Sequence, residues 1–90
     1  MPQVLKMRRG QVVKPGQVRI DRATKWGNPF VIGRDGTRDQ VCDKYEAWFE
    51  TQPHLIAALP EIAAADAVLC WCAPLRCHGD FLVKRSRRSQ

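Results

Sequence analysis

The chain has 90 residues, carries a formal net charge of +6, and is 44% hydrophobic and 27% charged. This length leaves no room for a second hydrophobic core, so residues 1–90 are expected to form a single domain. The composition is that of a globular chain and excludes a disordered one. We expect a core over about residues 3–83, followed by a basic tail over residues 84–90.

Neither a leader peptide nor a membrane span is predicted. The first residues, MPQVLKMRRGQVVKPGQ, lack the uninterrupted apolar stretch of a signal peptide. No window approaches the roughly 18 apolar residues that cross a bilayer. We therefore expect a cytoplasmic protein without membrane contact, in a compartment that keeps thiols reduced. Its four cysteines are then expected to be metal ligands, reactive thiols or core residues rather than disulfides.

Positive charge is concentrated at the two ends of the chain. Residues 1–25 hold seven cationic side chains and one acidic side chain, and residues 84–90 hold four cations and no acid. Residues 35–66 are net acidic. This asymmetry favours an anionic partner, which would be a nucleotide or a nucleic acid. The alternative is a solvated basic surface with a frayed tail.

The first half of the chain predicts two strands, a loop and a helix. The strands cover residues 3–7 and 17–21, joined by a loop or a hairpin that contains glycine and proline. Residues 25–38, KWGNPFVIGRDGTR, hold three glycines and a proline and are expected to be mostly loop. Thr37 is then a candidate helix cap, and Gln52-Pro53 should end the helix. Its apolar stripe, spaced i, i+4, i+7 and i+8, consists of Val41, Tyr45, Trp48 and Phe49.

The second half predicts a broken helix, a strand and a last helix. Residues 54–66 should be a short helix that breaks near Pro60, and residues 67–72 a strand. The last helix should start at about Gly79, with Asp80 near its N-terminus. One small sheet of about three strands, packed with two to three helices, is an α+β fold or a small α/β fold.

Residues 70–80, CWCAPLRCHGD, hold three of the four cysteines and allow three interpretations. The first is a zinc site, because Cys70 and Cys72 share one face of a strand, and Cys77 and His78 return after a short loop. Three thiols and an imidazole are ligands that structural zinc prefers. The spacing differs, however, from the familiar pair of C-x2-C knuckles.

The second interpretation is a reactive thiol at Cys77, where a helix N-terminus and neighbouring Arg76 would stabilise the thiolate. His78 would act as its base, and Asp80 would orient a partner. In the third interpretation Cys70 and Cys72 are core residues, His78 satisfies a backbone group in a turn, and Asp80 caps the last helix. Cys42, alone on the first helix, is expected in the core.

The segment KWGN, residues 25–28, is interpreted as a ligand loop. Trp26 would be partly exposed and offer a stacking face, while Lys25 and Asn28 supply a charge and an amide. Arg22 and Arg38 are expected to join Lys25 as phosphate anchors. In the alternative, Trp26 closes the core with Pro29 and Phe30, and Asn28 makes a turn hydrogen bond.

We also predict that residues 25–28 and the CHGD turn, residues 77–80, meet at one end of the sheet. Both follow predicted strands, and ligands gather where strands end and helices begin.

Three blocks together, KWGNPF with its trailing IGRDGTR, DQVCDKYEAWF and LCWCAPLRCHGDFL, resemble the family called domain of unknown function 4326. These are small uncharacterised proteins of bacteria, archaea and phages, and the resemblance covers about residues 17–83. It implies no established activity. The positions that it implies as matching the family's signature are Lys25, Trp26, Gly27, Asn28, Pro29, Phe30, Asp35, Gly36, Cys70, Cys72, Pro74, Cys77, His78, Gly79 and Asp80. Residues 28–45 also resemble, by analogy only, the opening of the NADAR fold, which handles ADP-ribose-type nucleotides.

The leading hypothesis is a domain that binds a nucleotide or nucleic acid. Arg22, Lys25 and the N-terminus of the last helix would hold the anion, and Trp26 would stack on a base. Catalysis by His78 and Asp80 is left open. The alternatives are a zinc-stabilised adaptor without catalysis and a phage-type protein-interaction domain.

Overall fold

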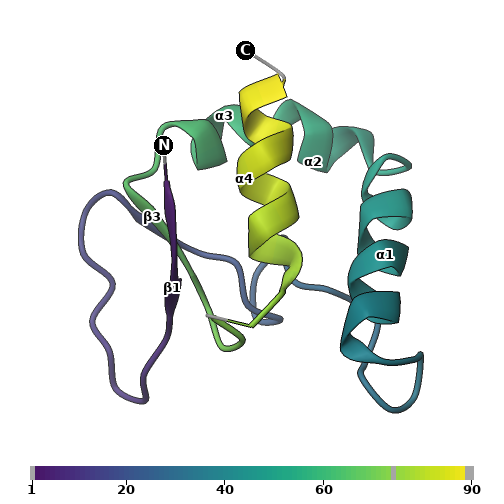
Figure 1. Cartoon of the computed structure of the whole chain (residues 1–90). Helices are drawn as coiled ribbons and strands as arrows, with labels where there is room; N and C mark the ends of the chain where they lie inside the picture. The colour runs from purple at the N-terminus through teal and green to yellow at the C-terminus, as the bar shows by residue number, and fades with distance from the viewer. Residues whose placement is uncertain (1, 74, 89–90) are drawn as a thin grey trace.

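The computed structural model describes residues 2–73 and 75–88, and within them it has a three-stranded sheet and four helices, an α+β arrangement (Figure 1). The predicted fold class and order of elements are confirmed. In chain order the elements are β1 (Gln3–Lys6), β2 (Gln17–Arg19), α1 (Arg38–Phe49), α2 (Pro53–Ala57), α3 (Leu59–Ala63), β3 (Ala67–Cys70) and α4 (His78–Arg88).

The helix predicted to break near Pro60 is present as α2 and α3, which raises the helix count above the expected two to three. Ala58 ends α2 and begins α3. Pro60 lies in the first turn of α3. A proline has no backbone N–H to donate, so it fits the first turn of a new helix better than the interior of one long helix.

All three strands are parallel, with β3 in the centre between β1 and β2. The register places Val4 and Val18 on either side of Val68, and all three pack into the core. The hairpin considered for the first two strands is therefore wrong. Parallel strands cannot be joined by a tight turn, because the chain must first return to the starting edge of the sheet. Residues 7–16 make that return as a loop, drawn at the left of Figure 1.

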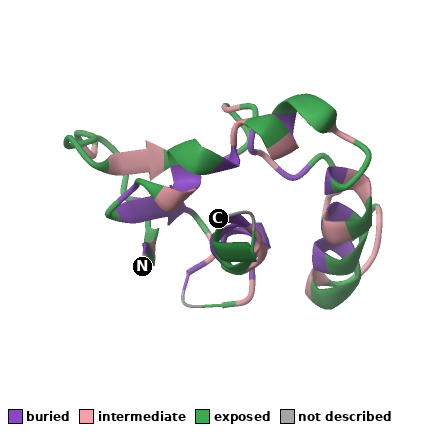
Figure 2. Cartoon of the chain, turned by 90° about the horizontal axis from the view of Figure 1, so that it is seen from above, coloured by how far each residue is buried: buried purple, intermediate pink, exposed green. Residues whose placement is uncertain are grey.

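Seen from above, α4 stands end-on between the sheet and α1, with α2 and α3 along a third side (Figure 2). Gly79 lets α4 approach the sheet closely, since a Cβ at this position would lie 2.8 Å from Cδ1 of Ile20. Leu82 and Val83 are buried on the inner side of α4. The core therefore lies between one face of the sheet and the helices, with Leu55 of α2 and Leu59 and Ile62 of α3 among its fully buried members.

The ends of the helices agree with the predicted signals. The Thr37 hydroxyl accepts a hydrogen bond from the N–H of Gln40, whose side chain in turn accepts one from the N–H of Thr37. This reciprocal pair satisfies donors that an uncapped helix leaves free. At the other end of the chain, α4 continues to Arg88, so the basic tail predicted over residues 84–90 is helical as far as Arg88. Residues 89–90 lie outside the described part. In the described residues no helix has the length and apolar character that crossing a membrane requires.

Candidate functional site

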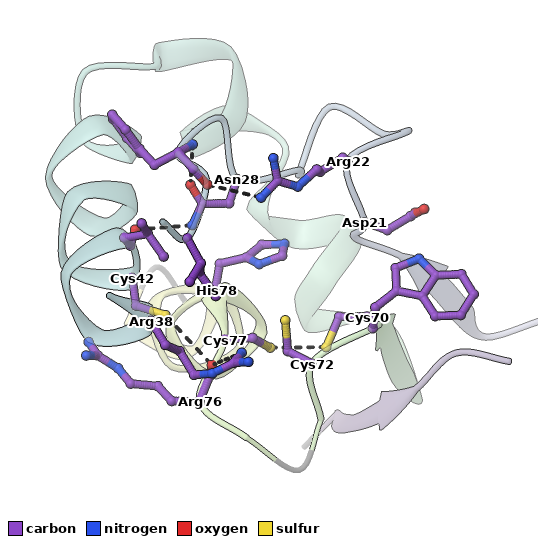
Figure 3. Close-up of a pocket in the computed structure, with 14 residues that line it drawn as sticks. Asp21, Arg22, Asn28, Arg38, Cys42, Cys70, Cys72, Arg76, Cys77 and His78 are labelled. Carbon is purple, nitrogen blue, oxygen red and sulfur yellow. Dashed lines mark hydrogen bonds between the residues drawn. The ribbon is translucent and has the colours of Figure 1, made fainter. Parts of the chain in front are cut away.

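A pocket of about 230 Å³ lies where the parallel strands end (Figure 3). Four segments build it: the loop after β2, the first turns of α1, the end of β3 with the turn that follows, and the start of α4. Ligands of parallel sheets gather at this carboxyl edge, because loops and helix N-termini converge there. The lining residues are Asp21, Arg22, Asn28, Phe30, Ile32, Arg38, Val41, Cys42, Cys70, Trp71, Cys72, Arg76, Cys77 and His78.

Many of the predicted site residues do meet in this pocket. Asn28 and His78 both line it, which confirms for these two residues that the KWGN loop and the CHGD turn lie together. Arg22 and Arg38, the two predicted phosphate anchors from the flanking segments, line it as well.

Trp26 and Lys25 do not line the pocket, and the prediction that Trp26 is partly exposed is wrong. Trp26 is 2% exposed and belongs to the core, and its carbonyl accepts a hydrogen bond of 2.8 Å from the hydroxyl of Tyr45. Burying the large indole removes much apolar surface from water and so stabilises the fold. The polar residues next to Trp26 in the sequence gave no sign of this burial. Lys25 turns to α3, where its Nζ lies 3.0 Å from a carboxylate oxygen of Glu61.

Asn28 supports the pocket from within the loop. Its Nδ2 donates to the carbonyl of Val41 at 3.1 Å, and its Oδ1 accepts from the N–H of Phe30 at 2.9 Å. The predicted alternative of a turn hydrogen bond is thus confirmed. Gly27 has a related function, since a Cβ there would lie 2.6 Å from Cα of Arg22. The close approach that this glycine permits is between two parts of the same loop.

The two anchor arginines bring positive charge to the pocket. Nη2 of Arg22 donates to the carbonyl of Phe30 at 3.1 Å, and Nη1 of Arg38 donates to the carbonyl of Arg76 at 3.3 Å. Neither forms an ion pair with a carboxylate among residues 2–73 and 75–88. Their charges are therefore left to attract an anion.

The other charged residues of the lining are compensated. Arg19 makes two hydrogen bonds to the Asp21 carboxylate, at 2.7 and 3.1 Å, and they hold the pKa of Asp21 below its usual range. The indole of Trp71 also contributes, to a smaller extent, to this lowering of the Asp21 pKa. The guanidinium of Arg76 is surrounded by three carboxylates at 2.8–3.0 Å, those of Asp39, Asp43 and Glu46.

His78, the first residue of α4, is neutral at pH 7, because burial lowers its pKa. Its Nε2 lies 2.5 Å from the carbonyl oxygen of Ile20. A carbonyl only accepts, so Nε2 carries the proton and Nδ1 carries a lone pair. Every buried side-chain nitrogen or oxygen of the described residues has a hydrogen-bond partner, and Nδ1 makes no hydrogen bond to them. The lone pair of Nδ1 therefore reaches solvent.

Cys70 and Cys77 form a close pair of thiols, with Sγ atoms 3.1 Å apart. The hydrogen bond from Cys77 lowers the pKa of Cys70 below that of an ordinary thiol, and backbone N–H groups of Cys72 and Ala73 act in the same direction. Cys77 retains its proton beside the Cys70 thiolate, which raises the pKa of Cys77. Cys70 is therefore the thiol of the pair that loses its proton first.

The predicted zinc ligands are only partly brought together. Cys70, Cys72, Cys77 and His78 all line the pocket, but the imidazole Nε2 is hydrogen-bonded to Ile20. Within the described ranges no group of three or more histidine, cysteine or acidic side chains is arranged to hold a metal ion. The zinc site stays a prediction that elemental analysis of the purified protein tests.

Asp80 lies outside the lining and accepts a hydrogen bond of 3.2 Å from the N–H of Cys77. Asp80 therefore caps the start of α4, as the third interpretation of residues 70–80 predicted. The Cys77 thiol in turn accepts from the N–H of Gly79 at 3.3 Å, so the two side chains cap the start of α4 together. No hydrogen bond between Cys77 and His78 joins a nucleophile to a base in the described part.

Sequence reasoning missed the residues that form the apolar side of the pocket. Trp71 is 48% exposed, and Ile32 and Phe30 line the pocket with it. The signal for Trp71 was its place directly after the last strand, where side chains reach a ligand site. Cys42 is buried, as predicted, and burial raises the pKa of its thiol.

The fold and the pocket define a small α+β domain whose pocket lies at the carboxyl edge of a parallel sheet. The chain belongs to the family described as Domain of unknown function (DUF4326), whose model matches residues 4–88, and the resemblance is thus confirmed. Of the positions predicted to match the family's signature, Pro74 lies outside the described residues.

The chain is 30% identical over 69 residues to the uncharacterized protein R718 of Acanthamoeba polyphaga mimivirus. The match covers 68% of this chain and 52% of the viral protein, so the chain spans about half the length of this relative. No solved structure matches the chain.

Proposed function

We propose that the pocket binds a mononucleotide, with the phosphate between Arg22 and Arg38 and the base against Trp71. The observation that carries the proposal is the pair of arginines, which reach one pocket from different elements and are hydrogen-bonded to backbone carbonyls. An arginine forms strong, charge-assisted hydrogen bonds to phosphate oxygens.

The surroundings of the two arginines favour binding of an anion. Arg38 is the first residue of α1, and His78 is the first residue of α4. Helix N-termini carry partial positive charge and favour a phosphate nearby. The negative charge of Asp21 is offset by Arg19, so it opposes a phosphate only weakly.

The apolar side supports a planar group as the second part of the ligand. Trp71 is half exposed and lines the pocket. Aromatic side chains stack on the faces of bases with little dependence on which base is present. The predicted stacking residue Trp26 is thereby replaced by Trp71.

The pocket volume of about 230 Å³ favours a mononucleotide over a longer strand. His78 would accept a hydrogen bond from the ligand through Nδ1. As part of the proposal, we expect the protein to act in the cytoplasm, where its four unbridged cysteines stay reduced.

Calorimetric titration with adenosine 5′-monophosphate, ribose 5-phosphate and adenosine tests the proposal. We expect the monophosphate to bind best, because only it has both phosphate and base. Arg22→Ala and Arg38→Ala should each weaken its binding about tenfold or more, since a hydrogen bond to a charged group contributes about 1.5–3 kcal/mol. Both should also flatten the salt dependence.

Lys25→Ala is the matched control, because Lys25 is a nearby cation directed to Glu61. Its binding curve should equal that of the wild type. Absence of any binding at millimolar nucleotide, or equal binding of adenosine and its monophosphate, would contradict the proposal. Tighter binding of a short single strand than of a mononucleotide would reassign the site to nucleic acid.

A further inference from the structure

Two thiols of the pocket, those of Cys70 and Cys77, are unbridged and have their Sγ atoms 3.1 Å apart. Cys70 ends β3 and Cys77 precedes α4, so two different elements fix their positions. A disulfide has an S–S distance of about 2.05 Å, and its formation here requires an approach of about 1 Å. Rotation of the two side chains would supply such a movement.

The polar groups around the two sulfurs favour a thiolate at one of them. The N–H of Gly79 donates to the Cys77 sulfur at 3.3 Å, and the backbone N–H groups of Cys72 and Ala73 help to lower the pKa of the Cys70 thiol. The thiolate, rather than the thiol, is the nucleophile in sulfur oxidation. Two cysteines that served only as small apolar core residues would not need this set of donors.

A small oxidant reaches the pair through the pocket. Both cysteines are almost fully buried in the folded chain, yet both line the pocket. In Figure 3 a dashed line joins the sulfurs of Cys70 and Cys77, and Cys72 is drawn beside them. Because access to the two sulfurs is limited, the oxidant must be no larger than a few atoms.

We propose that Cys70 and Cys77 form a reversible oxidation site at which a peroxide generates a disulfide. The Cys70 thiolate attacks one oxygen of hydrogen peroxide, the O–O bond breaks, and the departing hydroxide takes up a proton to become water. The Cys77 thiol then attacks the sulfenic acid sulfur, the S–O bond breaks, and the thiol proton leaves with the hydroxyl as a second water. Two thiols lose two electrons, which reduce one peroxide, and a thiol reductant reverses the change.

The bridge would act on the wall of the pocket. It would close the segment 71–76, which carries Trp71 at its start and Arg76 at its end. The carbonyl of Arg76 is the acceptor for Arg38. Oxidation would thus constrain residues that line the pocket. The oxidation site does not depend on whether the pocket binds a nucleotide.

The tryptic cleavage sites of the chain allow a direct test. Cleavage after Lys44, Arg76 and Lys84 places Cys70 and Cys72 in the peptide 45–76 and Cys77 in the peptide 77–84. Cys42 falls in the separate peptide 39–44. The reduced protein is treated with a small excess of hydrogen peroxide, free thiols are alkylated, and the digest is analysed by mass spectrometry with and without a reductant.

We expect the peptides 45–76 and 77–84 to be linked after oxidation and separated by the reductant. Cys72→Ser is the matched control, because it removes the neighbouring, half-buried thiol and should leave the link intact. Cys70→Ala and Cys77→Ala should abolish the link. Wild type and Cys72→Ser decide the question even where a core variant does not fold.

Three outcomes would overturn the proposal. The first is a digest in which the peptides stay unlinked while Cys70 is oxidised beyond the sulfenic acid. The second is loss of the link in Cys72→Ser, which would make Cys72 the bridging residue. The third is a zinc ion in the purified protein that protects these thiols from peroxide.

Discussion

Two tryptophans, each in a loop that follows a strand, lie in opposite environments. Trp26, after β2, is 2% exposed and packs into the core with Tyr45. Trp71, directly after β3, is 48% exposed and faces the pocket. Their neighbours differ in the same way, since Lys25 is directed away from the pocket and Cys70 and Cys72 line it. The loop after β2 therefore stabilises the fold with Trp26, and the turn after β3 presents Trp71 to a ligand.

The largest expected effect is on the stability of the Trp26 side of this comparison. Trp26→Ala should lower the free energy of unfolding by about 3–5 kcal/mol, because it leaves a large cavity in the core. Trp71→Ala should change it by only about 0.5 kcal/mol, as surface substitutions do. Urea denaturation followed by far-ultraviolet circular dichroism measures both. Equal losses in the two variants would remove the distinction between core and surface tryptophan.

The second expected effect is on binding at Trp71. Trp71→Ala should weaken binding of adenosine 5′-monophosphate by about 1–3 kcal/mol, the range found for one base stacked on one aromatic side chain. Trp71→Phe keeps an aromatic face and should retain most of the affinity. Calorimetry at fixed salt compares the two variants with the wild type. An unchanged affinity in Trp71→Ala would place the base elsewhere.

A smaller effect is expected from the titration of His78. Burial lowers its pKa below the ordinary 6.5, so between the two values the unfolded chain binds more protons than the folded chain. The free energy of unfolding should therefore fall as the pH drops below 6.5, by at most about 1.4 kcal/mol per pH unit.

His78→Gln is the control for this pH dependence, because a glutamine amide keeps a donor toward the carbonyl of Ile20 and does not titrate. Thermal melts between pH 7 and pH 5 should show a shallower decline in the variant. The corresponding contribution of Asp21 lies below pH 3.8, outside this range, and titration of Cys70 affects both proteins alike. Identical pH profiles would exclude His78 as the origin.

The smallest effect is expected at Lys25, which lies in the loop after β2 and is directed to Glu61. Its ion pair with Glu61 is solvent-exposed, and such pairs contribute about 0–1 kcal/mol. Lys25→Ala should therefore lower the stability slightly. Denaturation with and without 1 M salt measures this, since about that concentration screens exposed charges within a few ångströms. A loss that persists in high salt would point to packing of the lysine stem on Trp26 instead.

The sequence by itself determined the elements and the kinds of chemistry that are present. The spacing of Val41, Tyr45 and Phe49 and the cap at Thr37 are local signals, and a helix forms from such local contacts. The approach of the KWGN loop to the CHGD turn was also predictable, because both follow strands. That inference held for Asn28 and His78, which line the same pocket.

Only the tertiary structure decided which side of each loop faces the pocket and which strands pair. β3 lies between β1 and β2, and no local pattern in residues 3–19 encodes a partner that begins at Ala67. The same holds for the two tryptophans, whose residue type is equally suited to a core and to a ligand site. Trp26 is buried because α1 places Tyr45 over its loop, whereas no described helix covers Trp71 at the end of the central strand. Side-chain direction at a loop depends on what packs against it, and the chain supplies those partners from elsewhere in its length.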